Sequence, residues 1–142
     1  MHRLRDILQP RGPAIVSPDA SVAEAARRMA ERNVGAILVL EGDQLRGIFS
    51  ERDVMTRVVA EGLDPLSTQV RAVMSTVLTT IDESANVEQA GKLMDEHKCR
   101  HLPVMREGKV VGVVSMRDLM HIDIEAKTDE IRHMQAYIQT GQ

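Results

Sequence analysis

The stretches GIFSERD (47–53) and GVVSMRD (112–118) decide the fold of this chain. Each consists of a glycine, two apolar residues and the tetrapeptide Ser-x-Arg-Asp, and the two copies start 65 positions apart, at Gly47 and Gly112. The same offset aligns residues 16–54 with residues 81–119 without a gap. Because self-similarity at a fixed period marks a repeated structural unit, the two halves of the chain are one unit duplicated.

Each unit has the same predicted order of elements, β-α-β-β-α. Apolar residues at helical spacing follow Ser21 and Asn86, and each of these has Glu or Gln three positions later, as in a capping box. Two apolar runs joined by a Gly-containing turn then predict a hairpin, and a second helix begins at Ser50 or Ser115. The predicted strands are 14–16, 35–40 and 45–49 in the first unit and 79–81, 101–105 and 110–114 in the second.

The pair of units, rather than one alone, is the predicted folding unit. Half of the chain, roughly 60 residues, buries too little surface to be comfortably stable, so we expect the two sheets to share a common core. The fold class is α/β (α+β), with one repeat at 5–62 and the other at 70–122. The segments RDIL (5–8) and RAVM (71–74) lead into the first strand of each repeat.

The last part of the chain, residues 123–142, is predicted as an amphipathic helix that runs past the second repeat. Its apolar stripe begins within that repeat, has spacings of three, four and seven, and is interrupted by Lys127. The stripe could pack on its own domain or against a second subunit, and we favour the second subunit because the helix extends beyond the repeat that would cover it. The stripe residues are Met120, Ile124, Ile131, Met134 and Ile138.

Composition argues against several classes of function. A net charge of −3 and a pI near 5.9 are unusual for a nucleic-acid-binding protein, and Phe49 and Tyr137 are the only aromatic residues available for stacking on bases. No apolar run is long enough to span a bilayer, and the charged start MHRLRD does not resemble an export signal. Cys99 is the single cysteine, so no internal disulfide is possible. We therefore expect a cytoplasmic protein.

The repeated pattern resembles the cystathionine β-synthase-type (CBS) domain. Both copies contain V-x-x-A-x-x-x-M, an apolar strand and G-h-h-S-x-R-D (h, apolar), and the segment RHLPV (100–104) of the second copy strengthens the resemblance. The resemblance covers about residues 5–120, and GIFSERDVMTRVVAEGLDP (47–65) is similar to stand-alone bacterial two-repeat proteins. It implies two repeats packed with pseudo-two-fold symmetry through their sheets, and two clefts that hold an adenosine-type ligand. It also implies a homodimer that regulates an effector protein, which the sequence does not identify.

The Ser-x-Arg-Asp motifs allow two interpretations that can hold together. Ser-x-x-Asp at a helix start is a common cap, whereas free N–H groups at a helix start and the neighbouring Arg52 or Arg117 suit a phosphate. By resemblance, Asp53 and Asp118 would bind the ribose while the serines approach the phosphate. The predicted ligand-binding residues are Ile15, Val16, Gly35, Ala36, Ile37, Ser50, Arg52, Asp53, Thr80, Ile81, Arg100, His101, Leu102, Pro103, Ser115, Arg117 and Asp118.

The two sites are expected to differ. Small Gly35-Ala36 in the first repeat leaves room where Arg100-His101 in the second offers hydrogen-bond donors, and Thr80 corresponds to Ile15. Gly47 and Gly112, inside strands, indicate a bulge or tight packing between repeats in preference to close approach of a ligand.

Neither a metal site nor an enzyme is predicted. The alternating residues His97, Cys99 and His101 could be imagined as metal ligands, but their counterparts Arg32, Val34 and Ala36 are not a ligand set, so no metal site is predicted. No Walker A, G-x-G-x-x-G, H-E-x-x-H or G-x-S-x-G motif is present.

The predicted function is therefore a regulatory module that binds AMP first, and NAD(H), ATP, ADP or S-adenosylmethionine next, without a catalytic cofactor. The alternative is a ligand-free interaction scaffold or a DNA-associated CBS protein.

Overall fold

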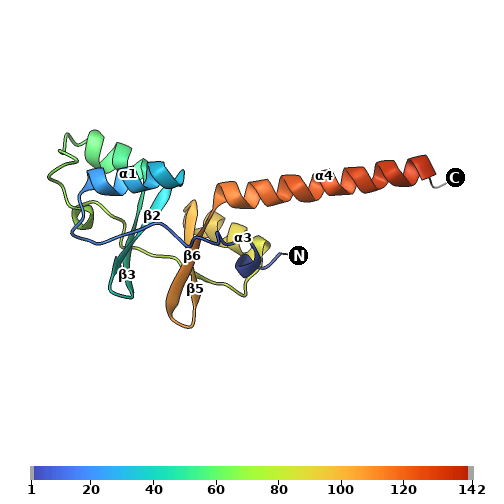
Figure 1. Ribbon diagram of the computed structural model, residues 1–142, viewed down its shortest axis with the longest axis horizontal. Coiled ribbons are helices and arrows are strands. Elements are labelled where there is room, and N and C mark those ends of the chain that lie inside the picture. Colours follow the sequence, from blue (N-terminus) through green and yellow to red (C-terminus); the bar gives the residue numbers. More distant parts are fainter. Residues whose placement is uncertain (1, 141–142) are drawn as a thin grey trace.

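Two three-stranded sheets stand side by side in the computed structural model, which describes residues 2–140 (Figure 1). Each half of the chain builds one sheet, in the order β1-β2-β3 or β4-β5-β6. The α+β fold of two β-α-β-β-α repeats with a C-terminal helix is confirmed. The first half contains β1 (Ile15–Val16), α1 (Val22–Arg32), β2 (Ala36–Glu41), β3 (Gln44–Ser50) and α2 (Glu51–Asp53). The second contains β4 (Ile81–Asp82), α3 (Val87–His97), β5 (His101–Arg106), β6 (Lys109–Ser115) and α4 (Met116–Thr140).

The first helix of each repeat starts where its cap predicts. The Ser21 hydroxyl oxygen accepts a hydrogen bond of 3.1 Å from the backbone N–H of Glu24. Asn86 and Gln89 form a reciprocal capping box, with two bonds of 2.9 Å. These bonds satisfy N–H groups that a helix start leaves without partners. The predicted side-chain cap is therefore confirmed at both helix starts, and the reciprocal box is present at Asn86.

A bulge interrupts each hairpin beside a glycine. In the first sheet β2 and β3 are antiparallel, and the register shifts between Val39, which faces Gly47, and Leu40. In the second sheet the shift falls between Val104, which faces Gly112, and Met105. The bulge that the two glycines predicted is therefore present in both repeats.

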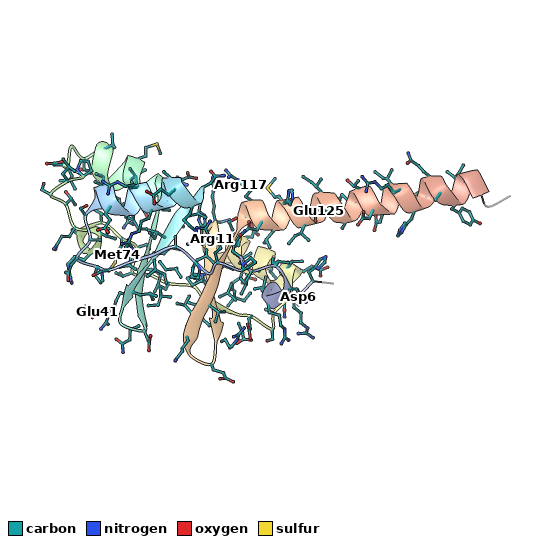
Figure 2. All side chains as sticks on the ribbon, in the orientation of Figure 1. Asp6, Arg11, Glu41, Met74, Arg117 and Glu125 are labelled. Atoms are coloured by element: carbon teal, nitrogen blue, oxygen red, sulfur yellow. The ribbon has the colours of Figure 1, made fainter. Side chains whose placement is uncertain are left out.

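The same glycines accept a segment from the other half of the chain. A Cβ atom at Gly47 would lie 2.6 Å from Met74 Sδ and 2.8 Å from the backbone oxygen of Ser75. A Cβ atom at Gly112 would lie 2.7 Å from Leu8 Cδ2. Such distances are shorter than van der Waals contact allows, so a side chain at either glycine would require the lead-in segment to shift. The obstacle at Gly47 includes a backbone oxygen, next to Met74, which is labelled in Figure 2.

The buried residues form two clusters rather than the single common core that we expected. The lead-in helix η1 (Leu4–Asp6) precedes the first repeat, yet Leu4 is buried in the cluster of the second. Conversely η3 (Val70–Ala72) precedes the second repeat, and Val70 and Val73 are buried in the cluster of the first. Each half therefore contributes its lead-in segment to the apolar cluster of the other half.

The second helices of the two repeats differ most. After Ser50 the chain forms the short α2 and continues as a π-helix, η2 (Val54–Val59). The Thr56 hydroxyl donates a hydrogen bond of 2.9 Å to the Arg52 carbonyl and competes there with backbone N–H groups of the helix. After Ser115 the predicted second helix and C-terminal helix are one continuous α4, which extends far beyond the sheets (Figure 1). The predicted end of that helix, Gly141 and Gln142, lies outside the described residues.

Among residues 2–140, no helix combines the length and apolar character needed to cross a bilayer.

Candidate functional site

Both Ser-x-Arg-Asp motifs form reciprocal capping boxes at helix starts. The backbone N–H of Ser50 donates to Asp53 Oδ2 (2.9 Å), and the N–H of Asp53 donates to Ser50 Oγ (3.2 Å). Ser115 and Asp118 repeat this arrangement at 2.8 and 3.1 Å. The capping interpretation is therefore confirmed in both copies, and each aspartate keeps its second carboxylate oxygen outside the capping box.

Each motif is fixed to the start of the middle strand of its own sheet. The Glu51 N–H donates to the Gly35 carbonyl (2.9 Å), and the Met116 N–H donates to the Arg100 carbonyl (2.8 Å). In the sheets, Ala36 faces Ser50 and His101 faces Ser115. The residues that the sequence singled out at 35–36, 50–53, 100–101 and 115–118 thus lie together at one end of each sheet.

The two repeats meet at Gly35. A Cβ atom there would lie 3.0 Å from Glu51 Oε1 and 3.3 Å from Nε2 of His101, which belongs to the other sheet. The space that Gly35 was predicted to leave open is thus partly filled by the imidazole of His101 from the second repeat. Sequence reasoning missed Glu51, because it occupies the variable position of Ser-x-Arg-Asp, and its counterpart Met116 packs against the apolar cluster.

His101 is the titratable group on which the two repeats act together. Its burial, the largest influence, lowers the pKa of the imidazole below the usual value near 6.5. The carboxylates of Glu51 and Asp118 act in the opposite direction, and the guanidinium groups of Arg100 and Arg117 add to the lowering. The lowered pKa of His101 favours the neutral imidazole, and an anion bound beside it would act in the opposite direction.

Three arginines of the predicted site are available to an anion. Arg52, Arg100 and Arg117 are exposed, and within the described part of the chain their guanidinium groups make no hydrogen bond or ion pair. Figure 2 shows Arg117 where β6 passes into α4. The cation environment of the two aspartates differs, because Asp53 Oδ1 lies 3.6 Å from Arg57 Nε, whereas residue 122, the counterpart of Arg57, is an isoleucine.

Several predicted binding residues have side chains that are buried in the core. The side chains of Val16, Ile37 and Leu102 are fully buried in the apolar clusters, and Pro103 is buried as well, so these positions can offer a ligand only backbone atoms. Their predicted place at the ligand site therefore stays a prediction, and it concerns main-chain contacts. Ile81 is half-buried against the second cluster, whereas Ile15 and Thr80 remain exposed.

A family comparison follows the same division of the chain. The model of the CBS domain matches residues 4–60 and again residues 70–125. The chain belongs to the CBS domain family. CBS-pair proteins are generally regulatory, and the two matches together cover most of this CBS pair.

Three relatives illustrate the similarity. The CBS domain-containing protein YhcV of Bacillus subtilis (strain 168) is 41% identical over 106 residues, which cover 75% of each protein. A solved structure of a CBS protein from Burkholderia ambifaria MC40-6, for which a role in signal transduction has been suggested, is 33% identical with a TM-score of 0.82, covering 87% of this chain and 95% of that one. A CBS domain protein from Pyrobaculum aerophilum, solved in complex with AMP, is 29% identical with a TM-score of 0.74, covering 82% of this chain and 89% of that one.

Two cavities of the CBS pair lie away from the predicted site. A polar cavity of about 460 Å³ is lined by Arg3, Ser84, Ala85, Asn86 and Gln89. A shallow apolar one of about 280 Å³ lies near the end of α4. In the part of the chain that the structure describes, no three His, Cys, Asp or Glu side chains gather closely enough to hold a metal ion.

Proposed function

We propose that this CBS pair is a regulatory sensor that binds an adenosine nucleotide, AMP first, at the sheet ends carrying the two Ser-x-Arg-Asp motifs. NAD(H), ATP, ADP and S-adenosylmethionine are the next ligands by preference. Binding would be communicated to an effector protein, which makes the chain a signalling module rather than an enzyme.

One observation carries the proposal: each motif brings a carboxylate and an unpaired arginine to the same sheet end. An unpaired, exposed guanidinium is suited to a phosphate. The second carboxylate oxygen of Asp53 or Asp118, which the capping box does not use, is suited to ribose hydroxyls, as acidic residues are in dinucleotide folds. The complex of the Pyrobaculum aerophilum relative with AMP supports the same ligand class.

The two sites are proposed to bind unequally. In the first, Arg57 competes for Asp53, and Ile15 offers no polar group. In the second, Thr80 is exposed, and Arg100 and His101 add donors beside Ser115. The second motif is therefore the better candidate for tight binding.

We also propose that the sensor acts as a homodimer through α4. The stripe that sequence analysis assigned either to its own domain or to a second subunit is more than half exposed at every apolar position, so its own domain does not cover it. A second copy is the proposed cover, and the proposed location of the protein is the cytoplasm.

A thermal-shift panel tests the nucleotide proposal. A ligand at about one hundred times its Kd stabilises a folded protein by about 2.7 kcal/mol, which for this size is a rise of several degrees in Tm. We expect that rise with AMP and none with inorganic phosphate at the same concentration. If AMP, ADP, ATP, S-adenosylmethionine and NAD(H) all leave the Tm unchanged at millimolar levels, the chain is not an adenosine-nucleotide sensor, and a salt-dependent DNA titration tests the alternative.

A further inference from the structure

The stripe of α4 has the spacing of a two-helix seam. Its members follow one another at intervals of four, three, four, three and four residues, the alternation that lets two helices stay in contact along their length. We call this set the seam. The seam consists of Met120, Ile124, Lys127, Ile131, Met134 and Ile138.

The seam faces away from the body of its own chain. Met116 and Leu119 of α4 pack against the second apolar cluster, and Ile122 is half-buried. The apolar seam residues are all exposed. Figure 2 shows the side chains of α4 beyond Glu125 standing clear of the sheets. An amphipathic helix normally buries its apolar face, so a second helix that covers this face would remove the exposed side chains from water.

The position of Lys127 in the middle of the seam distinguishes a parallel from an antiparallel pair of helices. Its ammonium group lies 3.2 Å from Asp123 Oδ2 on the same helix, and both groups are exposed. In a parallel pair each seam residue would face its own copy, so two Lys127 side chains would meet across the interface. Like charges placed together in this way are destabilising.

An antiparallel pair removes this conflict and uses the whole seam. Met120 then faces Ile138 of the partner subunit, Ile124 faces Met134, and Lys127 faces Ile131, so that all six positions are matched in one register. The aliphatic stem of Lys127 can lie along Ile131 of the partner subunit. Its ammonium group then lies beside the partner's Glu130, which is exposed in the single chain.

We infer that α4 pairs with α4 of a second copy in an antiparallel register that sets Lys127 against Ile131 and Glu130 of the partner subunit. This geometry rests on the homodimer proposed above and adds its direction and register. Two Lys127 and two Glu130 side chains form a group without net charge at the centre of the interface. The nucleotide sites then lie at opposite ends of the paired helices.

Spin labels on the full-length chain test the direction. Thr128 and Gln135 are exposed and lie seven residues apart on the same helix face, so single-cysteine variants there, made with Cys99→Ser, form a matched pair. With a rise of 1.5 Å per residue, the antiparallel register offsets the two labels along the axis by about 3 Å at position 128 and about 18 Å at position 135. We expect a short distance at 128 and a clearly longer one at 135 by pulsed electron resonance, with both variants dimeric by sedimentation.

Each other outcome overturns the inference in a recognisable way. Equal distances at the two positions indicate a parallel pair, and long distances at both place the partner elsewhere, for example over the exposed Met55 and Val59; either result keeps the homodimer and removes this geometry. A monomer without dipolar coupling overturns the homodimer too, while AMP binding, measured separately, stays unaffected by that result.

A charge exchange provides an independent test on unlabelled protein. Lys127→Glu sets a carboxylate beside the partner's Glu130 and should weaken the antiparallel dimer by on the order of tenfold, counting two symmetric contacts. Adding Glu130→Lys should restore most of the affinity. In a parallel dimer Lys127→Glu only replaces one like-charge pair with another, so an unchanged dimer affinity for that variant, or a failure of the double variant to recover, overturns the antiparallel register.

Discussion

Replacing Asp118 by Asn and by Ala separates its two roles. As a cap, Asp118 Oδ2 accepts the 2.8 Å bond from the Ser115 N–H. An asparagine oxygen can still accept that bond, so Asp118→Asn should keep most of the stability, whereas Asp118→Ala should lose about 1 kcal/mol. As a ribose acceptor, the side chain needs its negative charge and its second oxygen, and both variants lack the two features.

The expected loss of binding is therefore the same in the two variants. A hydrogen bond to a charged group contributes about 1.5–3 kcal/mol, which corresponds to roughly ten- to a hundred-fold in Kd for AMP. Titration calorimetry gives the affinity and urea unfolding gives the stability, with Asp53→Asn as the matched variant of the first repeat. If both Asp118 variants bind AMP as the wild type does while Asp118→Ala is less stable, Asp118 is a helix cap and nothing more.

Three further predictions address packing, pH and assembly. Gly47→Ala should lower the free energy of unfolding by about 1–3 kcal/mol, because the new Cβ atom meets the backbone oxygen of Ser75. Gly112→Ala meets only the flexible end of Leu8, so it should lower the free energy of unfolding by less. Urea unfolding measures both losses, and equal losses would contradict this explanation. Because burial lowers the pKa of His101, the unfolded chain binds a proton at this residue more readily than the folded chain. The stability of the protein should therefore fall as the pH drops below about 6.5, and it should fall less in His101→Gln. Thermal melts at pH 7.5 and 5.5 measure both effects, and an identical pH dependence in the two proteins would refute this prediction. Truncation after Asp123 should shift the protein towards monomer in analytical ultracentrifugation with AMP binding largely retained, and a truncated dimer would move the interface to the repeats.

Features encoded locally were predictable from the sequence. The caps at Ser21 and Asn86, the hairpins and the two Ser-x-Arg-Asp starts each depend on residues only a few positions apart, and the structure reproduces them. The bulges beside Gly47 and Gly112 were predictable for the same reason, since a glycine inside an apolar strand requires a local explanation. Strand ends shifted by one or two residues, as in β4, which begins at Ile81 rather than at position 79.

Features that depend on how the halves meet were not predictable. The segments 5–8 and 71–74 resemble each other, and nothing in their residues indicates that each packs on the other repeat. Glu51 approaches Gly35 and His101 only because the two sheets are brought together. The burial of Val16, Ile37 and Leu102 likewise depends on which strand faces are covered. In each case a long-range contact, rather than a local propensity, determines the outcome.

A crystal structure of the full-length chain grown with millimolar AMP tests the central claim most directly. The proposed function predicts AMP at the sheet end that carries Ser115 and Asp118, with the ribose hydroxyls on the Asp118 carboxylate and the phosphate near Ser115 and an arginine. AMP bound instead in the polar cavity lined by Arg3, Asn86 and Gln89, or no AMP in either repeat at that concentration, would contradict it.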